Sequence, residues 1–168
     1  MRFRGLALAL LLLAACSRSP KIETIAAGDW DQVIAGHRGS VAVVLVWATW
    51  CRSCENLLPA FAALERRLRE DEIRFLTVTL DDHDNPGAIA QASEMLSRHE
   101  ASFPHYVFAS EISGSLATLG IRNVPAVLVY DAEGAPRHRL ETGVFDNDLS
   151  VADIEDAIES LRSPPAAE

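Results

Sequence analysis

The chain has 168 residues, 49% of them apolar, and its formal net charge at pH 7 is −9. This length and apolar content suit one domain with a proper hydrophobic core, and they give no indication of a second domain or of low complexity. The negative charge argues against nucleic acid and anionic membrane surfaces as partners, because both favour basic patches.

The first sixteen residues have the pattern of an export signal rather than of folded structure. Arg2 and Arg4 precede an apolar run from Leu6 to Leu13, and small residues lie directly before Cys16. The run is too short to span a bilayer, which takes about 20 residues. The segment resembles a bacterial lipoprotein signal, which implies cleavage before Cys16, acylation of that cysteine and attachment to a membrane. An ordinary secretory signal is the alternative.

The first half of the predicted domain holds three strands and two helices. Residues 21–25 suit an edge strand, and residues 29–35 suit a short helix between glycines. Residues 41–47 are almost uninterruptedly apolar, which is typical of a strand covered on both faces of a parallel or mixed sheet. From residue 54 to 68 apolar residues recur at three- and four-residue steps, which predicts an amphipathic helix. Residues 73–80 alternate and are β-branched, which predicts another strand.

A Cys-x-x-Cys pair, Cys51 and Cys54, lies at the junction between the second strand and the helix that follows it. Free backbone N–H groups and the macrodipole at a helix N-terminus stabilise an anion, so Cys51 is expected to be the more acidic thiol. The thiolate is the reactive form of cysteine. One helical turn brings Cys54 to Cys51, so that a disulfide can close within the motif and reopen by exchange.

Two other interpretations of this pair are weaker. A zinc site needs four ligands, and the chain has no second pair and no closely spaced histidines. A purely structural disulfide is the other alternative. Export favours the redox interpretation, because disulfides persist outside the cytoplasm. If Cys16 is acylated, the redox pair also accounts for the other two of the three cysteines.

An acidic loop, residues 81–84, follows the third strand. Its spacing fails the calcium-loop pattern in every register, so we predict a solvated loop with helix-capping acids and no metal site. The histidines show no tight spacing and are expected to be surface or loop residues rather than ligands. They are His37, His83, His99, His105 and His138.

The second half of the domain continues the alternation of helices and strands. A strand at 126–130, a turn and a strand at 137–142 suggest a hairpin, and Ser150 with Asp153 resembles a capping box. The remaining predicted elements are a helix at 86–99, a strand at 103–109, a helix at 112–119 and a final helix from 151 to 161. The predicted organisation is a signal peptide at 1–15, a lipidated cysteine and tether at 16–20, a folded domain at 21–162 and a tail at 163–168.

Three segments resemble, in order, landmarks of thioredoxin: residues 44–51, which end in Trp-Ala-Thr-Trp-Cys, residues 80–87, and the Gly-Ile-Arg-Asn-Val-Pro of residues 120–125. The match covers nearly all of the predicted domain. It implies an α/β thioredoxin-like fold with a central mixed sheet flanked by helices. The spacing between Cys51 and Pro125 exceeds the thioredoxin minimum, which implies a helix-strand insertion before the cis-proline strand. With its lipoprotein signal, the chain resembles TlpA-type thioredoxin-like oxidoreductases.

The resemblance also implies roles for individual residues. It implies a cis peptide between Val124 and Pro125 beside the disulfide, where these residues and Trp50 bind an extended substrate segment. Two carboxylates known from such families are missing, since this chain has Leu45 and Leu57 at their positions. Glu55 and Asp81 are the remaining candidates for proton transfer to and from Cys54, and water is the third.

These observations predict a lipid-anchored thiol-disulfide oxidoreductase of the bacterial cell envelope, facing the periplasm. The resemblance favours reduction of disulfides in envelope proteins, for example in cytochrome c or copper-site maturation, with a membrane protein as electron donor. No cofactor is expected beyond the Cys51–Cys54 disulfide, and a monomer is expected. The alternatives are a disulfide oxidase or isomerase, and a non-catalytic binding module with a static disulfide or a metal-thiolate clamp.

Overall fold

The computed structural model describes residues 19–69, 71–142 and 149–162. The strands are β1 (Ile22–Ile25), β2 (Val41–Trp47), β3 (Ile73–Thr79), β4 (His105–Phe108), β5 (Ala126–Tyr130) and β6 (Pro136–Glu141). The helices are α1 (Trp30–Ala35), α2 (Arg52–Leu68), α3 (Pro86–Arg98), α4 (Ile112–Leu119) and α5 (Val151–Arg162), and a short 3-10 turn, η1 (Ala27–Asp29), precedes α1. Every helix and strand predicted from the sequence is present, with boundaries shifted by a few residues at most.

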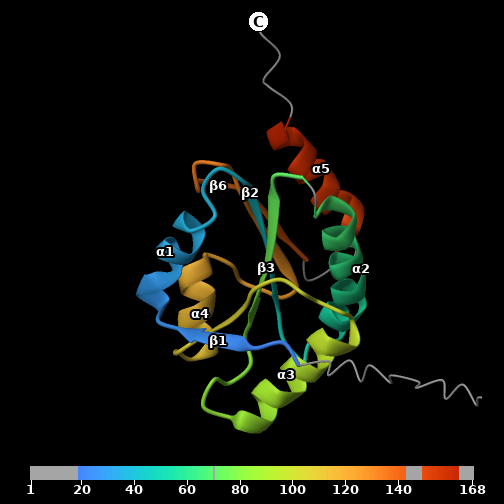
Figure 1. Ribbon diagram of the computed structural model, residues 1–168. Helices are drawn as coiled ribbons and strands as arrows, with labels where there is room; N and C mark the ends of the chain where they lie inside the picture. Colours follow the sequence, from blue (N-terminus) through green and yellow to red (C-terminus); the bar gives the residue numbers. More distant parts are fainter. Residues whose placement is uncertain (1–18, 70, 143–148, 163–168) are drawn as a thin grey trace, which may run out of the picture.

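The strands form one mixed sheet in the order β1-β4-β3-β2-β5-β6. The first four strands in this order run parallel, and β5 and β6 run antiparallel to their neighbours. Helices α1 and α4 cover one face of the sheet, and α2, α3 and α5 cover the other (Figure 1). The predicted α/β fold is therefore confirmed, and α3 with β4 forms the predicted insertion before the strand that follows Pro125.

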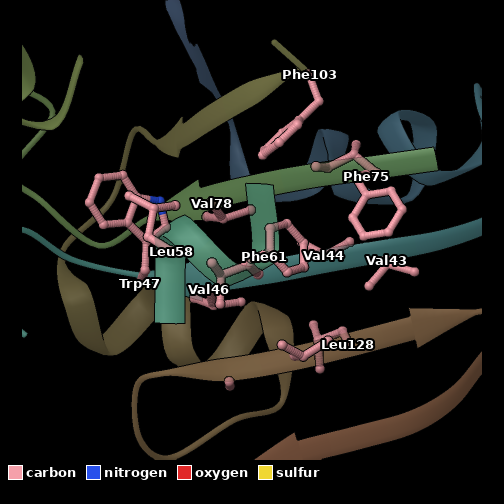
Figure 2. Packing of buried hydrophobic residues seen from close by; sticks show 14 of the residues in the cluster. Val43, Val44, Val46, Trp47, Leu58, Phe61, Phe75, Val78, Phe103 and Leu128 are labelled. Atoms are coloured by element: carbon pink, nitrogen blue, oxygen red, sulfur yellow. The ribbon is translucent and has the colours of Figure 1, made fainter. Parts of the chain in front are cut away.

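Strand β2 lies at the centre of the core, as its apolar sequence predicted. All seven of its residues are buried, because β3 and β5 flank it and helices cover both faces. Phe61 of α2 packs edge-on against Phe75 and Phe103, with ring centroids 5.2 and 5.7 Å apart (Figure 2). This packing holds α2 against the sheet.

The N-terminal caps of two helices, α5 and α3, show how local sequence determines where a helix begins. Ser150 and Asp153 form the predicted capping box, in which the Ser150 backbone N–H donates to the Asp153 carboxylate at 2.9 Å. For α3 the cap differs from the prediction. Asn85, rather than an acid, accepts hydrogen bonds from the N–H groups of Gly87 and Ala88. An Asn side chain serves this purpose as well as Asp does, and Pro86 occupies the first helical position as expected.

Candidate active site

Cys51 and Cys54 form a disulfide at the N-terminus of α2. Cys51 is the N-cap residue of the helix, and Cys54 lies one turn further along. The two cysteines differ in solvent exposure, since Cys51 is 7% exposed and Cys54 is fully buried. Cys51 is therefore the more accessible of the two, and its part as the attacking thiol stays a prediction.

The surroundings of the Cys51 sulfur favour negative charge on it. The backbone N–H of Cys54 donates to the Cys51 sulfur at 3.2 Å, and the Ser53 hydroxyl lies 3.6 Å from the same atom. Both contacts come from the first turn of α2, where the helix dipole adds to their effect. When the disulfide is reduced, these groups are in place to stabilise a thiolate on Cys51.

The peptide bond between Val124 and Pro125 is cis. Its place follows from the sheet register, because Ala126 pairs with Val46 of the antiparallel strand β2. The cis bond therefore lies at the edge of the sheet where β2 ends and the turn to Cys51 begins. The Glu141 carboxylate accepts a hydrogen bond of 2.7 Å from the Arg122 backbone N–H, which ties this loop to β6.

The side chains predicted to bind substrate lie at this same edge with different exposure. Trp50, directly before Cys51, is 58% exposed, whereas Val124 is half-buried and Pro125 is buried. An exposed tryptophan beside a reactive cysteine offers a large apolar contact to another chain. Binding of a substrate segment by Trp50, Val124 and Pro125 stays a prediction.

Asp81, one of the two candidates for proton transfer, is buried and fully engaged. Its carboxylate accepts hydrogen bonds from the backbone N–H of Thr49 at 3.1 Å, from the Thr49 hydroxyl at 2.6 Å and from the Thr79 hydroxyl at 2.5 Å. These contacts join the carboxyl end of β3 to the turn that carries Trp50 and Cys51. The other candidate, Glu55, is exposed in the first turn of α2.

Thr49 is the site residue that sequence reasoning missed. It lies two residues before Cys51. The sequence showed only that a hydroxyl-bearing residue follows an apolar strand at this position. Its partner, Asp81, lies 32 residues further along the chain, and only the pairing of β2 with β3 brings the two together.

Replacement of Asp81 by Asn is expected to lower the free energy of unfolding by about 1–3 kcal/mol, because a buried amide N–H2 would face hydroxyl and N–H donors. Urea unfolding of the oxidised protein measures this difference. Asp156→Asn, an exposed aspartate on α5, is the matched control and is expected to change stability by less than about 0.5 kcal/mol. Equal stability of the two variants would contradict the anchoring of the turn by Asp81.

Among the histidines, the prediction of a surface or loop position is wrong for His105. This residue begins β4, is 4% exposed, and lies between β1 and β3 in the sheet. Its Nε2 donates to the backbone carbonyl of Ala101 at 3.3 Å, so Nδ1 is the atom that accepts from the Thr77 hydroxyl at 2.8 Å. Burial lowers the pKa of His105 to about 4, so the side chain is neutral at pH 7.

The acidic loop after β3 brings three possible ligand side chains close together. One ligand atom each of Asp82, His83 and Asp84 lies within 4.8 Å of the others. Exposed acidic groups commonly cluster without an ion, and both aspartates are exposed. The expectation that this loop holds no metal stays a prediction.

The predicted signal peptide, Cys16 and the tail from residue 163 lie outside the described residues. Within the ranges that the structure describes, no helix combines the length and the apolar character needed to cross a bilayer.

Comparison with solved structures supports the fold. A thiol-disulfide isomerase from Corynebacterium glutamicum aligns with a TM-score of 0.64 and 18% identity, over 77% of this chain and 85% of that one. A secreted disulfide oxidoreductase from Mycobacterium tuberculosis aligns with a TM-score of 0.60 and 16% identity, over 76% of this chain and 86% of that one. At such low identity these structures are evidence for a shared fold alone.

Sequence comparison identifies the family. Residues 39–135 match the family model described as Thioredoxin-like. The thiol:disulfide interchange protein DsbE of Pseudomonas aeruginosa is 28% identical over 134 residues, which are 79% of this chain and 68% of the relative. The DsbE of Pseudomonas fluorescens biotype C is 30% identical over 120 residues, which are 71% of this chain and 61% of the relative. The chain therefore belongs to the thioredoxin-like family and is related to the DsbE thiol:disulfide interchange proteins.

Proposed function

We propose that this DsbE-related thiol-disulfide oxidoreductase reduces disulfides of proteins in the bacterial cell envelope. The observation that carries the proposal is the Cys51–Cys54 disulfide at the N-terminus of α2, in which Cys51 is 7% exposed and Cys54 is fully buried. The protein whose disulfide is reduced is called the client below.

In the reaction, the reduced protein attacks with the Cys51 thiolate. The Cys51 sulfur bonds to one client sulfur, the client S–S bond breaks, and the departing client thiolate takes up a proton. Cys54 then loses its proton and attacks the Cys51 sulfur of this mixed disulfide. The second client thiolate leaves, and the Cys51–Cys54 disulfide forms, so that two electrons have passed to the client.

The buried position of Cys54 creates the need for a proton acceptor in the second step. Cys54 is fully buried, and a thiol in such a place loses its proton less readily than one in water. Glu55 and Asp81 are the acids we propose for this transfer. Asp81 would have to act while holding the turn through Thr49, whereas Glu55 has open access to solvent.

Client binding is proposed at the edge that carries the cis peptide. The backbone of Val124 would pair with an extended client segment, beside Pro125, and the exposed Trp50 would cover its apolar side chains. In the oxidised state the enzyme must then be reduced again by a membrane protein that donates electrons. A monomer is sufficient for all of these steps.

The proposed location rests on the N-terminal sequence. Residues 1–15 would be removed as a lipoprotein signal, Cys16 would carry the lipid, and residues 16–20 would tether the domain at 21–162 to the membrane on the periplasmic side. Residues 163–168 form the proposed tail. Globomycin treatment, which blocks lipoprotein signal cleavage, would then cause a precursor to accumulate; an unchanged product would contradict the lipid anchor.

The direction of the reaction is tested by the reduction potential of the full chain. The protein is equilibrated with thiol buffers, and alkylation of Cys51 and Cys54 reports the reduced fraction. We expect a value near about −270 mV, as for thioredoxin, which fits a reductant. A value near about −120 mV would instead identify a disulfide oxidase. If the disulfide of the native protein is not reduced in any of the thiol buffers, the non-catalytic binding module with a static disulfide would be the remaining interpretation.

A further inference from the structure

A carboxylate of β6 holds the loop that leads to Val124. Glu141 accepts hydrogen bonds from the backbone N–H groups of Arg122, at 2.7 Å, and of Asn123, at 3.3 Å. Both bonds end on the same oxygen, Oε2, so one atom fixes two consecutive peptide groups. Hydrogen bonds to an ionised acceptor are roughly twice as strong as those between neutral groups. The half-buried Glu141 is therefore a firm support for this loop.

The next peptide group along the loop has no partner. Neither the N–H nor the C=O of Val124 forms a hydrogen bond with another described residue. Free main-chain groups of this kind are what an extended peptide pairs with when it adds to a protein edge. Of three consecutive N–H groups in the loop, Glu141 therefore occupies the first two, and the third is left for a client.

Strand β6 also contacts the start of the same loop. Arg139 lies two residues before Glu141, so the two side chains share one face of the strand. The Arg139 guanidinium approaches Gly120 so closely that a Cβ on that glycine would lie 3.2 Å from it. The position of Glu141 is set by pairing with β5, since it lies opposite Ala126 in the register. The hairpin thus determines where the loop before Pro125 lies.

The carboxylate is free for this purpose. Within the ranges that the structure describes, Glu141 forms no ion pair with a lysine, arginine or histidine. It also has no contact with Cys51, whose sulfur is bonded by groups of the first turn of α2. Loss of the Glu141 carboxylate would therefore release the loop without changing the surroundings of the attacking sulfur.

We propose that Glu141 is a positioning residue for client binding, which keeps Val124 in the conformation that pairs with an extended client segment. It acts through Arg122 and Asn123 and does not touch the client itself. The inference rests on the proposed function, because it takes the client to bind at Val124. A loop that is already ordered loses less conformational entropy on binding than one that must be ordered at the same time, so Glu141 strengthens client binding.

The test compares two substrates of the reduced full chain in nonionic detergent. One is a peptide with an internal disulfide, and the other is bis(2-hydroxyethyl) disulfide, which has no backbone to pair with Val124. Alkylation of Cys51 and Cys54 at successive times gives the second-order rate constant for each substrate. In Glu141→Ala we expect the constant for the peptide to fall about tenfold and that for the small disulfide to stay within about twofold of the native value.

Two further variants separate this role from a loss of charge or of folded structure. Glu141→Gln keeps a side-chain oxygen as acceptor and should reduce the peptide within about threefold of the native rate. Glu133→Ala removes the same charge from an exposed position at the other end of the hairpin and should leave both rates unchanged.

Three outcomes would overturn the positioning role of Glu141. They are an unchanged peptide rate in Glu141→Ala, an equal loss for both substrates, and a glutamine variant as slow as the alanine variant. Failure of the native chain to reduce the peptide would instead overturn the proposed function.

Discussion

Replacement of Cys51 by serine is expected to lower the rate of client disulfide reduction by at least about 1,000-fold. A serine hydroxyl stays protonated at neutral pH and forms no disulfide, so both the attack and the mixed disulfide are lost. Cys51 is also the member of the pair that reaches the surface, and the buried Cys54 cannot replace it. Insulin reduction with a thiol donor measures the rate.

The matched variant is Cys54→Ser, which removes the resolving thiol and leaves the attacking one. It should accumulate a covalent mixed disulfide with the client, visible on non-reducing gels, whereas Cys51→Ser should accumulate none. Both variants are compared with the reduced native chain, because each lacks the disulfide. Full insulin reduction by Cys51→Ser would refute the proposed reaction.

Protonation of His105 is expected to lower the free energy of unfolding by about 3 kcal/mol as the pH drops from 6.5 to 4. This loss comes in addition to the one that protonation of the carboxylates causes. Burial lowers the pKa of this residue from the usual 6.5 to about 4. Between these values the unfolded chain binds a proton that the folded chain excludes, so acid favours unfolding. Above pH 6.5 both states hold a neutral imidazole, and the contribution is fully present.

Urea unfolding at a series of pH values tests this expectation. His105→Gln removes the titrating group and should give a shallower loss of stability between pH 6.5 and 4, whatever its stability at pH 7. His138→Gln, on β6, is the control and should follow the native curve. Parallel curves for the native chain and His105→Gln would show that His105 does not exclude the proton.

The role of the Cys51–Cys54 pair was predictable because its signals are local. An uninterrupted apolar strand, a change to helical spacing and two cysteines at the change place a thiol at a helix start without any knowledge of distant residues. The same holds for α4, whose predicted bounds agree with the structure, since Gly120 provides its left-handed C-terminus.

Contacts between segments far apart in the chain could not be predicted from local sequence patterns. His105 looked like an ordinary polar residue, and only the insertion of β4 between β1 and β3 buries it. Asp81 was found as a strand-end acid, but its hydrogen bonds with Thr49 depend on the pairing of β3 with β2. No local sequence pattern predicts that Ile112 and Trp50 remain exposed at one edge of the sheet.

The sequence by itself determined the order of helices and strands, the reactive pair and the thioredoxin-like resemblance, because each depends on residue types at short spacing. Tertiary structure alone decided which polar groups are buried and which residues Asp81 contacts. The physical reason is that burial and charge proximity are properties of segments brought together by sheet pairing, here across 32 residues between Thr49 and Asp81.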